Sequence, residues 1–181
     1  MTGTSAPLVE RMRGAARLDI ATFEEVGRDP NATTQALAVV ALAGLADGLG
    51  SLRGDGGTGL IGGIIGSIIG WALFSLVAYV IGTSLFRTSA AANPGSVLRM
   101  LGFAYTPQLL SVFRIIPLIG WIPAVAGTIW FLIAAVFALR QSMDLSTAQA
   151  IGVGIISAIA YGIIKFFVAI ILNIALWGLR L

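Results

Sequence analysis

Three charged side chains lie within otherwise apolar segments of this 181-residue chain: Asp47, Arg114 and Lys165. A charge inside a membrane segment normally has a partner and often marks a functional site. Asp47 with Lys165 or with Arg114 is therefore the candidate intramembrane charge pair. The alternative is that each side chain extends alone towards the lipid headgroups. One acid and two bases without histidine do not make a proton relay, so this pattern does not predict a transporter.

The sequence contains no cysteine and no histidine. Their absence excludes cysteine–histidine zinc sites, iron–sulfur clusters, thiol redox chemistry, disulfides and histidine acid–base catalysis. The eight acidic residues are scattered, and a carboxylate metal site would need them clustered. We therefore expect no catalytic, cofactor-binding or metal-binding residues and no cofactor, and we predict that the protein is not an enzyme.

The composition is that of a membrane protein. Apolar residues make up 57% of the chain and charged residues only 10%, against roughly 25% charged in soluble domains. The net charge of +3 comes from few acids and not from basic runs, so we expect no nucleic-acid partner. Membrane lipids and other integral membrane proteins are the expected partners, and a homo-oligomer is compatible with the sequence.

The longest uncharged stretch, 56–86, runs for 31 residues. About 20 apolar residues suffice to cross a bilayer, so this stretch predicts a membrane-spanning helix over 60–85. Its first half carries glycines spaced by four, flanked by two more, and together they form a candidate helix-packing face: Gly59, Gly62, Gly63, Gly66 and Gly70. Such faces let helices approach closely, and we expect this one to pack within the chain more than between chains.

Four further apolar segments predict spanning helices at 33–52, 97–119, from 118 or 121 to 139, and within 148–179. Pro107 lies at the centre of the third span, where it should kink the helix because proline donates no backbone hydrogen bond. The last segment has two interpretations. Either 150–165 crosses and the remainder lies along the interface, or the span centres on Lys165. Too few residues follow Lys165 for a sixth span, so five spans are favoured.

Residues 1–31 are polar and are predicted to form a cytoplasmic amphipathic segment ahead of a transmembrane domain at 32–181. Apolar residues recur at helical spacing between Pro7 and Val26: Val9, Met12, Ala16, Ile20 and Phe23. This periodicity predicts one short amphipathic helix. It can lie on the membrane surface, dock a soluble partner, or simply pack on the spans, and the last of these is favoured.

The fold class predicted from these segments is all-α: a polytopic membrane protein with five transmembrane helices and a short amphipathic N-terminal helix. Positive charges are enriched on the cytoplasmic side of membrane proteins. With a cytoplasmic N-terminus, seven arginines lie inside (11, 13, 17, 28, 87, 99 and 140) and three outside (53, 114 and 180). We therefore expect a multi-pass protein of the cytoplasmic membrane with its C-terminus outside.

The order of these segments resembles the Yip domain family, multi-spanning proteins named for interacting with Ypt/Rab GTPases. The matching pieces are 18–40 (LDIATFEEVGRDPNATTQALAVV), the glycine-rich span from Gly59, 96–113 (SVLRMLGFAYTPQLLSVF) and 138–153 (ALRQSMDLSTAQAIGV). The resemblance implies a five-helix domain with a cytoplasmic N-terminus, and partner-mediated vesicle trafficking in eukaryotic members. It offers no catalytic residues. The Ala/Gly-rich composition is typical of a bacterial member, for which that trafficking partner cannot be carried over.

The expected function is that of a non-enzymatic membrane interaction or scaffold protein that binds other membrane proteins. A first alternative is an accessory structural subunit of a larger membrane complex. A second is a small transporter or lipid-handling protein, which would need a polar cavity at mid-depth. Few polar residues are available for such a cavity: Ser67, Ser75, Gln108 and Asn173.

Overall fold

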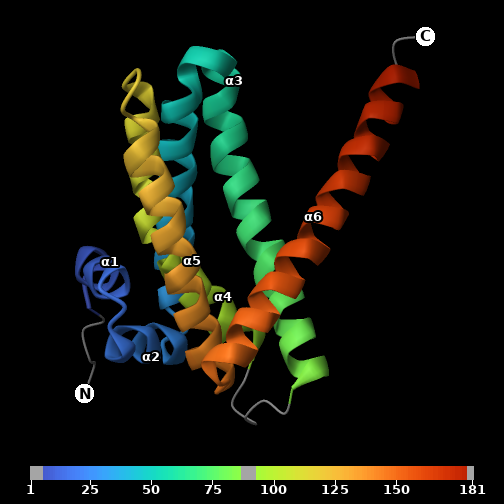
Figure 1. Ribbon diagram of the computed structural model, residues 1–181. Coiled ribbons are helices and arrows are strands. Elements are labelled where there is room, and N and C mark those ends of the chain that lie inside the picture. The colour runs from blue at the N-terminus through green and yellow to red at the C-terminus, as the bar shows by residue number, and fades with distance from the viewer. Residues whose placement is uncertain (1–5, 87–92, 179–181) are drawn as a thin grey trace.

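The computed structural model describes residues 6–86 and 93–178, without the side chains of 53–59, 169 and 172–178. The chain is all-α, and the described residues contain no strand. The helices are α1 (Leu8–Ala16), α2 (Ile20–Arg28), α3 (Ala32–Leu85), α4 (Pro94–Ala104), the 3-10 helix η1 (Thr106–Ile115), α5 (Trp121–Met143) and α6 (Thr147–Gly178). Figure 1 shows α1 and α2 beside one end of the bundle, while α6 ends at the other.

Helix α3 is folded back on itself and forms two antiparallel arms (Figure 1). The arms meet at two glycines: a Cβ built on Gly44 would lie 2.5 Å from the carbonyl oxygen of Gly63. Beside this contact, the Ser67 hydroxyl donates a hydrogen bond to the carbonyl of Val40 at 3.1 Å. The absence of side chains at Gly44 and Gly63 therefore lets the two backbones touch, as in other close-packed membrane helices.

The prediction of five transmembrane helices is wrong, because four helices in the described chain are long and apolar enough to cross a membrane. They are Ala32–Leu52 and Leu60–Leu85 in the two arms of α3, Trp121–Met143, and Thr147–Val168. The predicted third span, 97–119, is divided between α4 and η1, which have 11 and 10 residues. Each is too short to cross alone, although the two follow one another along the bundle (Figure 1).

Pro107 gives the physical reason for this division. Proline disfavours α-helical geometry at the preceding residue, and α4 ends at Ala104, after which the chain continues as the 3-10 helix η1 from Thr106. Instead of kinking one long helix, the segment changes its helix type. Next to this break, a Cβ on Gly127 of α5 would lie 2.6 Å from the Pro107 carbonyl oxygen. The break is therefore packed tightly against α5.

The N-terminal segment forms two helices, where the sequence predicted one. Leu18 adopts a left-handed conformation with φ 60° between them, which no continuing helix allows. Asp19 then begins α2, since its carboxylate accepts hydrogen bonds from the backbone of Ala21 and Thr22. The predicted apolar face is also partly wrong: Phe23 is buried, but Val9 and Ile20 are 56% and 46% exposed.

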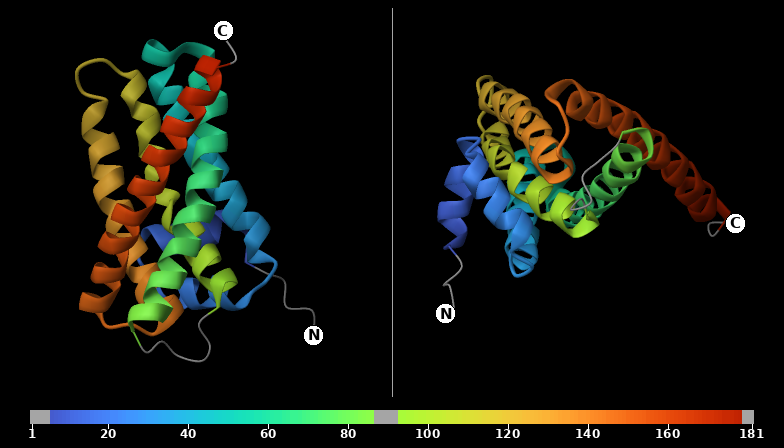
Figure 2. Two further views of the ribbon diagram at one scale, coloured as in Figure 1. Left: turned by 90° about the vertical axis from the view of Figure 1, so that its right-hand side faces the viewer. Right: turned by 90° about the horizontal axis from the view of Figure 1, so that it is seen from below.

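The core lies where α2, the arms of α3, α4 and α5 meet, in the half of the bundle nearest α1 and α2 (Figure 2). Its largest buried side chains include Phe23, Phe103, Leu139 and Met143. Trp71 ties the second arm of α3 to α4, because its indole nitrogen donates to the Leu98 carbonyl at 2.8 Å. The arms of α3, α4, η1 and α5 therefore form one packed bundle.

Helix α6 begins beside this bundle and then leaves it at an angle (Figures 1 and 2). Ser146 and Gln149 form a reciprocal cap at its start, with hydrogen bonds of 3.3 and 2.9 Å, the arrangement known as a capping box. Only 11% of the apolar window in Thr147–Val168 is buried, compared with 44% in Ala32–Leu52. Of the four candidate spans, this one is packed least against the rest of the chain.

Candidate functional site

The space between α6 and the bundle holds a groove of about 600 Å³, which we call the α3–α6 groove. One wall is the second arm of α3, and the other is the middle of α6 with Tyr161, Ile164 and Lys165. A Cβ on Gly62 or on Gly66 would meet nothing within 4 Å. These two glycines therefore present open backbone to the groove.

The five glycines of the predicted packing face have different environments. Gly63 lies against Gly44, and a Cβ on Gly70 would lie 2.7 Å from the Tyr161 hydroxyl. At Gly62 and Gly66, by contrast, a Cβ would enter open space. Gly59 falls in 53–59, outside the described side chains. Gly44, on the opposite arm, was missed in the sequence, although its spacing of four from Gly48 is a signal of close packing.

Two of the three intramembrane charges are brought together. The Arg114 guanidinium donates to the Asp47 carboxylate and, at 3.1 Å, to the Asp47 backbone carbonyl. Lys165 lines the same groove as Asp47, yet it forms no ion pair with any described side chain. Its ammonium lies 5.8 Å from the centre of the Tyr161 ring. The groove is therefore lined by one carboxylate, Asp47, that is already paired with Arg114, and by one cation, Lys165, without a counter-ion among the described residues.

Tyrosine hydroxyls and an amide add polarity to the groove, in the form of Tyr105, Gln108 and Tyr161. Nearer the start of α6 lies a second cavity of about 450 Å³, which shares Gly70, Tyr105 and Tyr161 with the groove. This second cavity is otherwise walled by apolar side chains of α3, α5 and α6. The two cavities together follow α6 from its packed half to its free half, and polarity is concentrated in the free half.

A second polar cluster fixes the N-terminal helices and was missed in the sequence. Arg11 is 2% exposed, and its guanidinium donates to Glu25 at 2.8 Å, to Asp29 at 2.7 Å and to Gln35 at 2.9 Å. Burial disfavours its charge, but the hydrogen bonds that Arg11 donates to Glu25 and Asp29 outweigh that effect and raise the Arg11 pKa. The hydrogen bond from Arg11 lowers the pKa of Asp29. Its partners all lie outside α1, so no pattern within that helix indicated the cluster.

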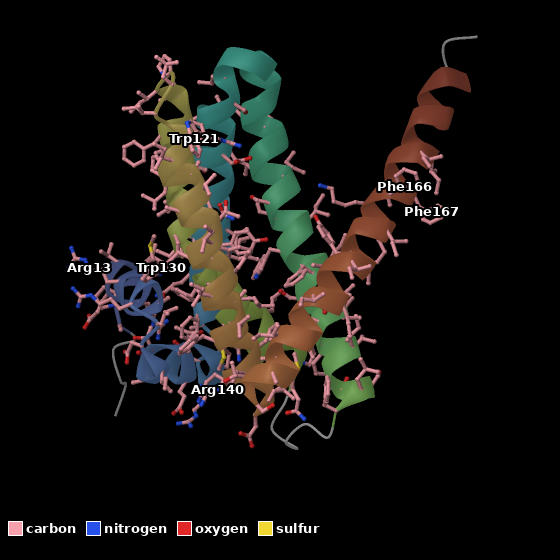
Figure 3. The ribbon with its side chains drawn as sticks, in the orientation of Figure 1. Arg13, Trp121, Trp130, Arg140, Phe166 and Phe167 are labelled. Atoms are coloured by element: carbon pink, nitrogen blue, oxygen red, sulfur yellow. The ribbon has the colours of Figure 1, made fainter. Side chains whose placement is uncertain are left out.

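Two further contacts hold these helices on the bundle. Arg99 of α4 donates to the backbone carbonyls of Val26, at 2.9 Å, and of Gly27. The indole nitrogen of Trp130 in α5 donates to the Ala16 carbonyl at 2.7 Å, and Figure 3 shows Trp130 beside α1. The N-terminal segment is therefore packed on the bundle rather than extended from it.

Comparison with known families identifies the family to which this chain belongs. The model of the Yip1 domain matches residues 20–178, from α2 to the end of α6. The chain belongs to the Yip1 domain family. The resemblance found in the sequence is thereby confirmed, and this Yip1 domain is a multi-pass membrane protein with apolar spanning helices. No curated protein and no solved structure matches the chain.

Proposed function

We propose that this Yip1 domain protein is a non-enzymatic membrane interaction protein, which binds other membrane proteins in the α3–α6 groove. The observation that carries the proposal is the unpartnered half of α6. Its large apolar side chains point in all directions and are 38–63% exposed from Ile163 to Ile171. A helix of this kind can satisfy its packing only against lipid or against another protein.

The chemistry of the groove favours a protein helix. Lipid tails are as apolar as leucine, so helices associate in membranes through close packing and polar contacts. Gly62 and Gly66 offer open backbone for such packing, and Lys165 offers an unpaired charge. A partner helix could use both features, whereas an acyl chain would use neither. An accessory-subunit role is a special case of this function with a fixed partner.

Lipid handling or transport is a second candidate, favoured by the polar side chains within the groove. Gln108 and Tyr105 line it together with Asp47, whereas Ser75 is 1% exposed. A water-filled path would let a charged maleimide reach a cysteine at Gln108 from both sides of the membrane, while a cysteine at Ser75 would stay protected. If Gln108→Cys is labelled from neither side, transport is refuted.

For localisation we propose the cytoplasmic membrane, with the N-terminal helices in the cytoplasm and the C-terminus outside. The distribution of arginines supports this orientation. Arg140 lies near α2, whereas Trp121 lies at the opposite end of α5 (Figure 3). Four other arginines belong to α1, α2 and the turn between them: 11, 13, 17 and 28. Arg114, in the last turn of η1, pairs with Asp47 in the far half of Ala32–Leu52, so the end of the bundle that carries α1 and α2 is the more positive one.

The proposal is tested in intact membranes with a photo-crosslinking amino acid in place of Ile164, which lines the groove. The matched control replaces Val125, an exposed residue of α5 that lies outside it. We expect one discrete protein adduct at Ile164 and none at Val125. Gentle extraction should then give a particle heavier than one chain, with that protein in fixed ratio. Adducts to lipid alone would refute the proposal.

A further inference from the structure

We propose that a polar cavity between α2, α4 and α5 binds a phosphate group, supplied by a lipid headgroup or by a soluble phosphate compound. The cavity measures about 520 Å³, within the ~300–1,000 Å³ that is usual for small-molecule sites. We call it the α4 cavity, and its polar lining includes Glu24, Arg28, Ser96, Arg99, Gln141 and Ser142. It shares no described lining residue with the α3–α6 groove, so a phosphate could bind here whatever occupies that groove.

Arg99 is a buried cation that forms no ion pair with any described carboxylate. The residue is 8% exposed, and its guanidinium donates from Nε to the Val26 carbonyl and from Nη2 to the Gly27 carbonyl. Its third nitrogen, Nη1, has no acceptor among the described residues. A Cβ on Gly95 would lie 3.0 Å from Nη1, which places this nitrogen against the first turn of α4. Buried charges are normally paired, and an anion is the partner that Arg99 lacks.

The pKa values of two buried arginines show the difference that a counter-ion makes. The hydrogen bonds that Arg11 donates to carboxylates raise its pKa despite burial. Burial lowers the pKa of Arg99, and it is opposed only by the charge of Asp29, with which Arg99 forms no ion pair. Asp29 already accepts a hydrogen bond from Arg11 at 2.7 Å. A phosphate beside Arg99 would supply the negative charge that Asp29 gives to Arg11.

The hydroxyl of Ser96 is a second donor available to the same ligand. Ser96 lines the cavity and is 7% exposed, and its hydroxyl forms no hydrogen bond within the described chain. The Asn93 side chain caps α4 by accepting from the Ser96 backbone at 2.7 Å, so the cap leaves the hydroxyl unused. The N-terminus of a helix carries about half a positive charge and favours anions. A buried hydroxyl, a buried guanidinium and a helix N-terminus therefore converge on one cavity.

Glu24 is a carboxylate in the lining, and both of its oxygens are already occupied. Arg28 donates to Oε2 at 3.2 Å, and Gln141 donates to Oε1 at 2.6 Å. The charge of Glu24 is thus offset by Arg28, whereas the charge of Arg99 is offset by no lining residue that the structure describes. The guanidinium fork of arginine matches the oxygens of a phosphate. A singly charged phosphodiester would therefore neutralise the described lining.

The depth of the α4 cavity favours a lipid headgroup as the source of the phosphate. Gln141 and Ser142 lie in the last turn of the span Trp121–Met143, and Arg140 beside them lies near α2 (Figure 3). Lipid phosphates lie where a spanning helix leaves the hydrocarbon, and basic pockets at this depth bind anionic headgroups. A phosphate bound here would contact α2, α4 and α5 together. It would therefore fasten the N-terminal helices to the bundle.

The test is thermal unfolding of the full chain in a neutral detergent, followed by tryptophan fluorescence. Phosphatidylglycerol or inorganic phosphate is titrated at constant ionic strength, and we expect a saturating rise in the unfolding temperature. Phosphatidylcholine, whose choline cation cancels the phosphate charge, should give no such rise. A rise with phosphatidylglycerol alone assigns the phosphate to a headgroup, and a rise with inorganic phosphate alone assigns it to a soluble compound. A rise with neither, or an equal rise with phosphatidylcholine, would overturn the proposal.

Two substitutions at Ser96 place the phosphate in the α4 cavity. Ser96→Ala removes the unused hydroxyl but keeps Arg99 and its bonds to α2, and it should raise the apparent dissociation constant at least about ten-fold. Ser157→Ala, at another buried serine outside the cavity, should leave that constant unchanged. Ser96→Asp puts a carboxylate in the place of the ligand, so it should raise the unfolding temperature without ligand and abolish the further rise. Equal binding by the unaltered chain and both Ser96 variants would overturn the proposal.

Discussion

The contact between Gly44 and Gly63 predicts that two neighbouring glycines respond oppositely to the same substitution. A Cβ on Gly63 would lie 2.6 Å from the Gly44 carbonyl oxygen and 3.1 Å from the Gly48 backbone nitrogen. Both obstacles are backbone atoms, so no side-chain rotation relieves the overlap and the two arms of α3 must move apart. On Gly62, one residue away, the same atom would meet nothing within 4 Å.

The magnitude follows from two opposing effects. Replacing glycine by alanine inside a helix favours the helix by about 1 kcal/mol, and this gain applies equally to Gly62→Ala and Gly63→Ala. Overpacking at Gly63 costs about 1–3 kcal/mol. We therefore expect Gly62→Ala to raise the free energy of unfolding by up to about 1 kcal/mol. The free energy of unfolding of Gly63→Ala should be about 1–3 kcal/mol lower than that of Gly62→Ala.

The assay is reversible unfolding in mixed micelles, followed by tryptophan fluorescence at a dilution where chains are separate. Gly152→Ala on α6 is a second control, because a Cβ there also meets nothing within 4 Å. The comparison of Gly62→Ala with Gly63→Ala tests the contact between the two arms of α3, because the gain in helix propensity is the same for both variants. Equal unfolding free energies for the two variants would refute the close approach of the two arms.

Three further predictions concern hydrogen bonds. Ser67→Ala should lower the unfolding free energy by about 1 kcal/mol because its hydroxyl is hydrogen-bonded. Ser157→Ala should not lower it, since that buried hydroxyl has no partner within the described chain, and an equal loss in both would contradict this. The hydrogen bond from Arg11 lowers the pKa of Asp29, so this bond stabilises the fold fully above about pH 4, near the pKa of Asp in an unfolded chain. The stabilisation is lost as the pH falls further, and we expect the loss to change Trp130 fluorescence. Arg11→Met should loosen the N-terminal helices by about 1.5–3 kcal/mol, seen as faster amide exchange in α1 and α2; unchanged exchange would refute the role of Arg11.

Span positions were predictable because a membrane segment is defined by a local property, its run of apolar residues. The predicted helix 60–85 coincides with the observed Leu60–Leu85, and 33–52 lies within Ala32–Leu52. The prediction of a spanning helix at 97–119 was wrong because Pro107 changes the backbone geometry, and hydropathy does not reflect such a change. Whether proline kinks a helix or ends it depends on the neighbours that receive the freed groups, and here α5 packs closely at Gly127.

The features of the site were harder to predict because they depend on distant partners. Lys165 was recognisable as an unusual charge, but its position across a groove from Asp47 follows from the tilt of α6. Tilt is set by packing against neighbours and not by the apolar sequence. The burial of Arg11 depends on Asp29 and Gln35, and both of these residues belong to later parts of the chain than its own helix. No periodicity within α1 encodes those contacts.

The docking of the N-terminal helices sets an order for assembly of the chain. The hydrogen bond from Trp130 to Ala16 joins residues 114 positions apart. Chains are synthesised from the N-terminus at about 5–20 residues per second, so Ala16 emerges roughly 6–23 s before its partner. During that interval α1 and α2 have no bundle to dock on, and their apolar faces are open to chaperones and to the membrane surface. Helices α1 and α2 are thus made before the bundle but dock after it, and their docking reports that α4 and α5 have been inserted.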